Sequence, residues 1–370
     1  MKFIDLNKQY QLIESGILQG IKTVLDHGQY IMGPEIAVLE KQLADFAGTR
    51  HAIVNASGTD ALFMALLALD VKPGDEIITS PFSFFATAEV IALCQAKPVF
   101  VDIDPISYNI DPAKIEAAIT PRTKAIMPVS LYGQCADMTA INKIAQKHNL
   151  PVIEDGAQSF GATHHGNYSC GLSTIGCTSF FPSKPLGGYG DSGACFTDDD
   201  KIAEILKEIR IHGQSERYCH SRIGINGRMD TIQAAILIEK MKLFPNEIKL
   251  RKEVGDRYSH LLADVVKVPF VAPENTSVYA QYTIEVENRD RFQASLQALG
   301  IPTAVHYPIA MHQQEALQYL GYKEGDFPHA EYASKHVVSL PMHPYLSMAE
   351  QQEVVKAVKN CVEKESVAVK

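Results

Sequence analysis

Short apolar runs alternate with segments of helical periodicity between residues 50 and 155, and this alternation constrains the fold more than any other feature of the chain. Strands that alternate with helices form a parallel sheet covered on both faces, because each crossover lays a helix against the sheet. We therefore predict an α/β fold with a large, mostly parallel sheet. The predicted strands are residues 52–54, 76–79, 98–103, 124–129 and 151–155, and the predicted intervening helices are residues 59–69, 86–94, 112–119 and 138–148.

Two amphipathic helices are expected before this region. The first carries apolar residues at helical spacing from Ile17 to Leu25 and ends at Gly28. The second begins at Pro34, which suits a first helical position, and ends at Gly48.

The C-terminal third has a different pattern. Residues 177–181 and 193–197 are rich in β-forming residues and are expected to be later strands of the same sheet. Residues 230–264 are expected to form helices, and the strands 281–287 and 303–307, with two further helices, suggest a smaller α+β unit. A chain of 370 residues exceeds the usual size of one core, so we predict a large domain at 1–245 and a small one at 246–370.

Composition excludes several classes of function. A formal net charge of −9 argues against a nucleic-acid or anionic-membrane surface. The seven cysteines have no C-x-x-C pair and no zinc-type spacing, so we expect reduced thiols and no metal site. The N-terminus has no apolar signal core, and no stretch reaches the length of a membrane span. A cytoplasmic protein is expected.

Four polar side chains follow the predicted strands in the middle of the chain: Asp155, Gln158, Ser179 and Lys184. A carboxylate at the end of a buried strand can face a ring nitrogen, and a desolvated lysine can act as a nucleophilic amine. Pyridoxal phosphate needs both groups, because its pyridine nitrogen must stay protonated and its aldehyde is held by a lysine. Most lysines are solvated, but the aromatic residues and proline before Lys184 provide an apolar approach.

Two further features suit a phosphorylated aromatic cofactor. Gly58 and Thr59 open a predicted helix after a strand, where backbone amides favour a phosphate. An isolated match of this kind would be an ordinary helix cap. Phe84 follows the strand at 76–79, where it could stack on a ring, although Phe82 and Phe85 beside it could equally be core residues.

Positive charge gathers locally between residues 210 and 228. Arginine side chains match phosphate and carboxylate oxygens in pairs, so this segment is the candidate for gripping an anionic substrate. A solvated basic loop is an equally good interpretation of each arginine alone. The four arginines are Arg210, Arg217, Arg222 and Arg228. His306 and Tyr307 are candidate substrate contacts, and packed histidines are the alternative.

The chain resembles the DegT/DnrJ/EryC1/StrS family of sugar-nucleotide aminotransferases, over nearly its whole length. The segments that carry the resemblance are SGTDAL (57–62), EDGAQSFGA (154–162), SFFPSKPLGGYGDSGA (179–194) and NGRMDTIQAA (226–235). It departs mildly from the family at Gly156, where relatives commonly have alanine, and at Ser192, where they often have glycine.

The resemblance implies a pyridoxal-phosphate-dependent transferase of fold type I, like aspartate aminotransferase, that acts as a homodimer with shared active sites. It implies that Lys184 holds the cofactor, that Asp155 pairs with the pyridine nitrogen and Gln158 with the ring oxygen, and that Phe84 stacks. It also implies that Asn226 reaches the partner's cofactor phosphate, and that the stretch holding His306 and Tyr307 lies at the active site.

The implied reaction moves an amino group from L-glutamate to a keto group of a UDP-linked sugar and yields 2-oxoglutarate. By resemblance the substrate is UDP-2-acetamido-2-deoxy-3-oxo-D-glucuronate, used in bacterial surface-polysaccharide (O-antigen) synthesis. Two alternatives stay open: amination of a UDP- or dTDP-linked 4-keto-6-deoxy sugar, and a cofactor-binding regulatory or scaffold protein without turnover. Lys184 speaks against the family's sugar dehydratases, which carry histidine at that position.

Overall fold

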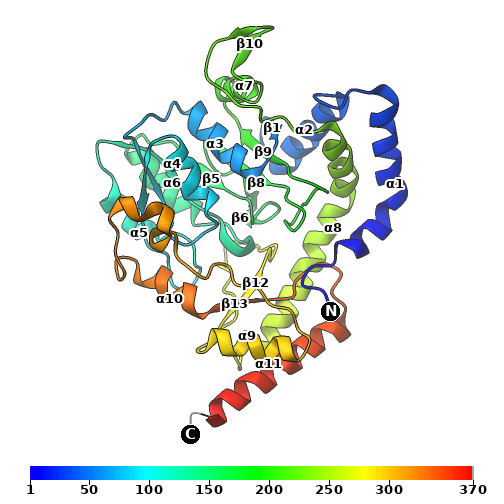
Figure 1. Ribbon diagram of the computed structural model, residues 1–370, viewed down its shortest axis with the longest axis vertical. Coiled ribbons are helices and arrows are strands. Elements are labelled where there is room, and N and C mark those ends of the chain that lie inside the picture. The colour runs from blue at the N-terminus through cyan, green and yellow to red at the C-terminus, as the bar shows by residue number, and fades with distance from the viewer. Residues whose placement is uncertain (369–370) are drawn as a thin grey trace.

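The computed structural model describes residues 1–368, and its larger part is built on one twisted sheet (Figure 1). Three strands pair in the parallel order β3-β2-β4, and four pair in the order β1-β9-β8-β5. Isolated parallel bridges between Ile126 and Val152 and between Val129 and Asp155 join the two groups. The seven strands are β1 (His51–Asn55), β2 (Glu76–Thr79), β3 (Lys97–Phe100), β4 (Thr123–Met127), β5 (Ile153–Asp155), β8 (Ile175–Ser179) and β9 (Gly193–Thr197).

This sheet confirms the predicted α/β class, with one strand of opposite direction. β9 is antiparallel to both β1 and β8. It follows β8 through a loop that contains no helix, and only a helical or similarly long crossover would have returned it in parallel. That intervening loop carries Lys184.

Side chains alternate between the two faces of the sheet, as the period of a strand requires. Ile53, Ile153 and Cys195 belong to the cluster that packs against α3, α4 and α7. Their neighbours Val54 and Phe196 belong to the cluster under α2 and α8. The helices of this part are α1 (Leu6–His27), α2 (Pro34–Ala47), α3 (Gly58–Ala68), α4 (Ala86–Leu93), α5 (Pro112–Ile115), α6 (Met138–Lys147), α7 (Asp200–Ile209) and α8 (Thr231–Leu262).

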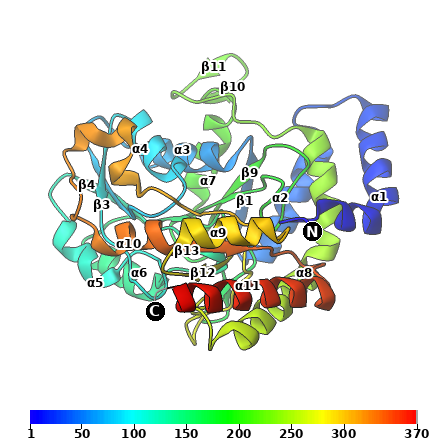
Figure 2. The same cartoon turned by 60° about the horizontal axis from the view of Figure 1, so that its bottom comes forward.

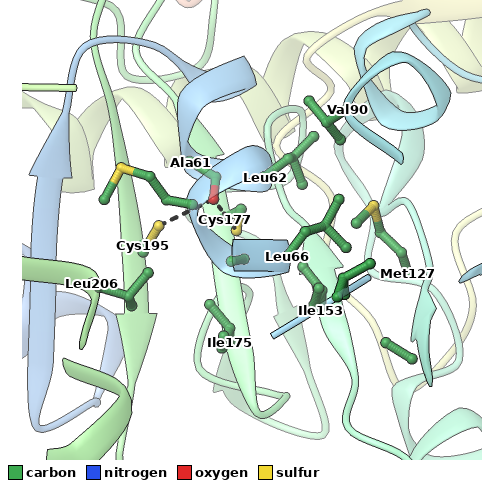
Figure 3. Close-up of a cluster of buried hydrophobic side chains, with 14 of the residues drawn as sticks. Ala61, Leu62, Leu66, Val90, Met127, Ile153, Ile175, Cys177, Cys195 and Leu206 are labelled. Carbon is green, nitrogen blue, oxygen red and sulfur yellow. Dashed lines mark hydrogen bonds between the residues drawn. The ribbon is translucent and has the colours of Figure 1, made fainter. Parts of the chain in front are cut away.

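Helix α3 is tied to the sheet by two thiols on adjacent strands (Figure 3). Cys177 on β8 and Cys195 on β9 face each other in register. Their sulfur atoms donate to the carbonyl oxygen of Ala61, at 3.4 and 3.3 Å. Because Ala61 lies in the first turn of α3, these contacts hold the start of the helix against the middle of β8 and β9.

The C-terminal part is a smaller layered unit (Figure 2). Strands β12 (Tyr282–Glu285) and β13 (Val337–Leu340) pair in antiparallel fashion, and a buried cluster joins them to α9 (Arg289–Ala298), α11 (Met348–Ala368) and the second half of α8. Helix α10 (Pro328–His336) leads into β13. The predicted boundary at 245/246 stays a prediction, and this position falls inside α8, beside Pro245.

Three local predictions in this region need correction. Residues 303–307 form no strand and contribute only the bridge from Ala304 to Ser339, because the chain then leaves the sheet toward Tyr132. The segment 230–264, expected to form several helices, contains the single long helix α8, Thr231–Leu262. The segment 210–228, expected as a loop, contains the hairpin of β10 (Gln214–Glu216) and β11 (Cys219–His220), which projects from the body (Figure 1).

The remaining elements are short. They are strands β6 (Thr163–His164) and β7 (Asn167–Tyr168) and the 3₁₀ helices Glu116–Ala118, Leu131–Gly133, Met311–Gln313 and Glu315–Leu320. Within residues 1–368, no helix has both the length and the apolar composition that a bilayer crossing requires.

Candidate active site

Lys184 lies in the loop between β8 and β9, in a tight turn where its backbone N–H donates to the carbonyl oxygen of Phe181 at 2.8 Å. Burial lowers the pKa of the Lys184 amine, and attraction by Asp155 acts in the opposite direction. Among the described residues, no side chain forms a hydrogen bond or ion pair with this amine. Lys184 is therefore an amine whose charge is disfavoured and whose nitrogen is available.

Asp155 ends β5, next to β8 in the sheet, and its side chain is 6% exposed. Thr87 Oγ1 donates to Asp155 Oδ2 at 2.8 Å, and the Ala157 N–H donates to Asp155 Oδ1 at 3.2 Å. Burial raises the pKa of Asp155, while these two hydrogen bonds and Lys184 oppose the rise. The site thus supports a buried carboxylate that gains from a cationic or protonated partner.

A tight backbone cradle lies where α3 begins. Ser57 caps the helix by accepting from the Asp60 N–H at 3.0 Å. A Cβ atom on Gly58 would stand 2.6 Å from Cβ of Ser179, so only glycine fits here. The cradle therefore combines the first backbone amides of α3 with the hydroxyl groups of Thr59 and Ser179. Amides and hydroxyls together suit a phosphate. The structure places Gly58 against Ser179, and phosphate binding by this set stays a prediction.

Gln158 is held on both sides by its neighbours. Its Oε1 accepts from the Tyr132 N–H at 2.9 Å, and its Nε2 donates to the Tyr307 hydroxyl at 3.0 Å. Burial raises the pKa of Tyr307. Gln158 therefore keeps one amide hydrogen free for a ligand, and Tyr307 is placed beside it.

The three aromatics after β2 are separated by their exposure. Phe82 is 1% exposed and belongs to a buried cluster, and Phe85 packs against the same cluster. Phe84 is 56% exposed, and its ring centroid lies 6.2 Å from that of Tyr307. Phe84 is thus the aromatic of this set with a free face.

His306 is fixed by contacts at both ends. Its Nδ1 is 2.9 Å from Ser339 Oγ, and its carbonyl oxygen accepts from the Tyr132 hydroxyl. Burial, with repulsion from Lys184 second, lowers the pKa of His306 to about 4. At neutral pH His306 is an uncharged donor or acceptor and not a cation.

The four arginines of the basic segment have different environments. Arg210 is buried and pairs with Glu40 at 2.5 Å, so it is a structural ion pair and not a free anion clamp. Arg222 pairs with Glu208 at 2.5 Å. Arg217 lies on the projecting hairpin over the ring of Tyr218. Arg228 differs from Arg210 and Arg222 in forming no ion pair among the described residues, and its buried Nε, like that of Arg210, has no hydrogen-bond partner there.

Asn226 is exposed, in the segment that borders the cradle. The next residue, Gly227, accepts through its carbonyl oxygen from the Ala56 N–H at 3.0 Å. Asn226 and Arg228 therefore lie on either side of a residue whose backbone is hydrogen-bonded next to the start of α3.

Two residues at this site were not predicted from the sequence. Thr87 donates to Asp155, and Tyr132 joins Gln158 to His306. Thr87 lies three residues after Phe84, so the expectation that a ligand crevice follows β2 could have included it. Tyr132 follows β4 without any distinctive motif, and only the tertiary structure identifies it.

The residues present fit pyridoxal phosphate. A glycine-dependent cradle suits its phosphate, a buried carboxylate suits its pyridine nitrogen, and a desolvated amine suits its aldehyde. No group of three or more metal-binding side chains occurs in the part of the chain that the structure describes.

Comparison with known proteins also indicates a protein of this cofactor class. The model of the DegT/DnrJ/EryC1/StrS aminotransferase family matches residues 11–359. The chain is 55% identical to UDP-2-acetamido-2-deoxy-3-oxo-D-glucuronate aminotransferase of Pseudomonas aeruginosa, over 97% of this chain and 100% of that protein. It is 45% identical to a pleiotropic regulatory protein of Geobacillus stearothermophilus, over 96% of each. The structure of NtdA from Bacillus subtilis with bound cofactor PMP is 34% identical, with a TM-score of 0.88, over 98% of this chain and 83% of that one.

The pKa of His306 predicts a pH dependence of stability. In the unfolded chain His306 titrates near its usual 6.5, whereas in the folded chain it stays neutral down to about 4. Between these values the unfolded state binds the extra proton, so the free energy of unfolding falls as the pH falls.

We expect His306→Asn to reduce that slope by up to about 1.4 kcal/mol per pH unit. The measurement is urea unfolding of the cofactor-free protein between the two pKa values, with the exposed His260→Asn as control. Equal slopes for wild type and His306→Asn would show that His306 is not buried in its neutral form.

Proposed function

The chain belongs to the DegT/DnrJ/EryC1/StrS aminotransferase family, a family of fold-type-I enzymes that depend on pyridoxal phosphate, and from this premise we propose its reaction. It transfers an amino group from L-glutamate to the C3 keto group of UDP-2-acetamido-2-deoxy-3-oxo-D-glucuronate. The observation that carries the proposal is the 55% identity, over 97% of the chain, to the Pseudomonas aeruginosa aminotransferase named for that substrate. The pathway would be the synthesis of a bacterial surface polysaccharide such as O-antigen, in the cytoplasm.

Lys184 would hold the cofactor and move the proton. Bound pyridoxal phosphate supplies an electron-withdrawing ring that allows a proton to leave the carbon bearing the amino group. The lowered pKa of Lys184 favours the neutral form of its Nζ, which can accept this proton and return it. The loop between β8 and β9 fixes the amine on the same side of the sheet as Asp155.

Asp155 would set the electronic state of the cofactor. Its carboxylate, held by Thr87 and the Ala157 N–H, would pair with the protonated pyridine nitrogen. Gly58, Thr59 and Ser179 would hold the phosphate, Gln158 the ring oxygen and Phe84 the ring face. Each of these roles requires only that the side chain stay where the fold has placed it.

Arg228 is the proposed contact to the anionic substrate. Arg210 and Arg222 are already paired with Glu40 and Glu208, whereas Arg228 forms no ion pair within residues 1–368 and its buried Nε has no partner there. A uronate carboxylate or a diphosphate oxygen would satisfy it. His306 and Tyr307 would contact the sugar as neutral hydrogen-bonding groups.

We propose a homodimer in which Asn226 completes the neighbouring site. The support is the exposure of Asn226 and of large apolar side chains near it: Ile223 in the same segment, and Ile31 and Met32, where Ile31 bridges Asp230. Burying such side chains between two copies is favourable, and it would bring Asn226 to the partner's cradle.

The substrate is tested by comparing catalytic efficiencies. With L-glutamate as donor, wild type should use the 3-oxo uronate better than a UDP-linked 4-keto-6-deoxy sugar. Arg228→Ala should lose about 2–5 kcal/mol of substrate binding, since it leaves a charged group unpaired. Arg50→Ala is the control, because Arg50 forms an exposed pair with Asp200. Preference for the 4-keto sugar would replace the proposed substrate, and no turnover on either would favour a regulatory protein.

The shared site is tested by mixing two inactive variants. Lys184→Ala and Asn226→Ala should each be inactive as homodimers, whereas a heterodimer contains one site with both native residues. About a quarter to a half of wild-type activity per dimer is expected in isolated heterodimers, because one of two sites is intact. Inactive heterodimers would contradict the contribution of Asn226 across the interface.

A further inference from the structure

A buried polar cluster lies behind Lys184, where segments far apart in sequence meet. It comprises Gln9 of α1, Glu247 and Arg251 of α8, and His343 and Tyr345 of the segment between β13 and α11. Helices α1 and α8 contact each other along this side of the molecule (Figure 1). Four of the five are at most 8% exposed, and Tyr345 is partly exposed.

The two charges of the cluster are unequally satisfied. Glu247 accepts from Gln9 Nε2 at 2.8 and 3.0 Å and from the Tyr345 hydroxyl at 2.6 Å. Arg251 is 4% exposed, yet among the described residues its one hydrogen-bond acceptor is the Tyr279 carbonyl oxygen at 3.4 Å. A guanidinium has five N–H donors, so most of its hydrogen-bonding capacity is unused.

Three buried polar atoms of this cluster have no hydrogen-bond partner within residues 1–368: Gln9 Oε1, Arg251 Nε and His343 Nδ1. All three residues line one small cavity, together with Pro182, Lys184, Pro185 and Gly187 of the cofactor-lysine loop. The space open to the centre of a water molecule is about 20 Å³, and roughly 10–15 Å³ is enough for one water.

The chemistry of the three atoms selects the ligand. Gln9 Oε1 needs a donor and Arg251 Nε needs an acceptor, so the ligand must do both. A cation would be repelled by Arg251, and an anion by Glu247 and Gln9 Oε1. Burial lowers the pKa of His343 to about 4, so its Nδ1 is neutral and can either donate or accept.

We propose that this cavity holds one internal water, bound by Gln9, Arg251 and His343. This water stabilises the position of the loop that carries Lys184. The proposal rests on the proposed role of Lys184. The water joins the first turn of α1 and the 343–345 segment to the loop that carries the lysine. The same loop is held by a second buried contact, because Lys240 Nζ donates to the carbonyl oxygen of the lining residue Gly187 at 2.6 Å.

The water also affects the proton equilibrium of the lysine. Lys184 lines the cavity, and a water there partly solvates its ammonium form. Removing the water desolvates the charged form further, which lowers the pH at which the amine becomes neutral. The positioning residue His343 thus acts on the amine through the water.

The test compares His343→Leu, which removes the third ligand, with His343→Asn, whose amide replaces Nδ1. Crystal structures of the holoenzyme, at a resolution that shows ordered water, should contain the water in wild type and His343→Asn and lack it in His343→Leu. The pH midpoint for capture of pyridoxal phosphate by the full-length apo protein should fall by about half to one unit in His343→Leu only, as loss of one hydrogen bond implies.

The exposed His260→Leu serves as the control, and Gln9→Met replaces His343→Leu if that variant does not fold. A dry or ion-filled cavity in wild type would overturn the proposal, as would an unchanged midpoint in a variant that has lost the water. A wild-type protein that captures no cofactor on Lys184 would instead contradict the proposed function, so the two failures are distinguishable.

Discussion

The burial of two groups of opposite charge, Lys184 and Asp155, is the constraint on which the rest of the structure depends. Burial disfavours the charged form of both, lowering the pKa of the amine and raising that of the carboxyl, while their mutual attraction partly restores the charges. Neither group is stable in this form unless the surrounding structure holds it there. The parallel pairing of β5 with β8 provides this, because it brings the ends of both strands to one edge of the sheet.

The same edge collects the other parts of the site. Helix α3 begins there, held by the thiols of Cys177 and Cys195, and Gly58 allows it to approach Ser179 closely. The C-terminal unit adds His306 and Tyr307 from beyond the bridge at Ala304. The candidate site is thus shared between two structural parts, and the buried cluster of Gln9, Glu247 and Arg251 lies behind its lysine.

Sequence patterns predicted the local parts of this arrangement well, because each has a local cause. Short apolar runs predicted β2 and β5, and the glycines after α1 and α2 end both helices in the left-handed conformation. Long-range contacts were not predictable in the same way. The pairing of Arg210 with Glu40 removed one candidate from the basic segment, and the roles of Thr87 and Tyr132 depend on residues that lie far along the chain.

The most direct test of the account is to find which lysine carries the cofactor. Borohydride reduction of the purified protein, followed by proteolysis and mass analysis, should place the phosphopyridoxyl group on Lys184. The most informative competing lysine is Lys240, which is also buried and whose pKa is lowered to about 8. Its Nζ, however, already donates a hydrogen bond to the carbonyl oxygen of Gly187. A label on Lys184 that is absent in Lys184→Ala agrees with the account, and a label on Lys240 or another lysine in the wild-type protein contradicts it.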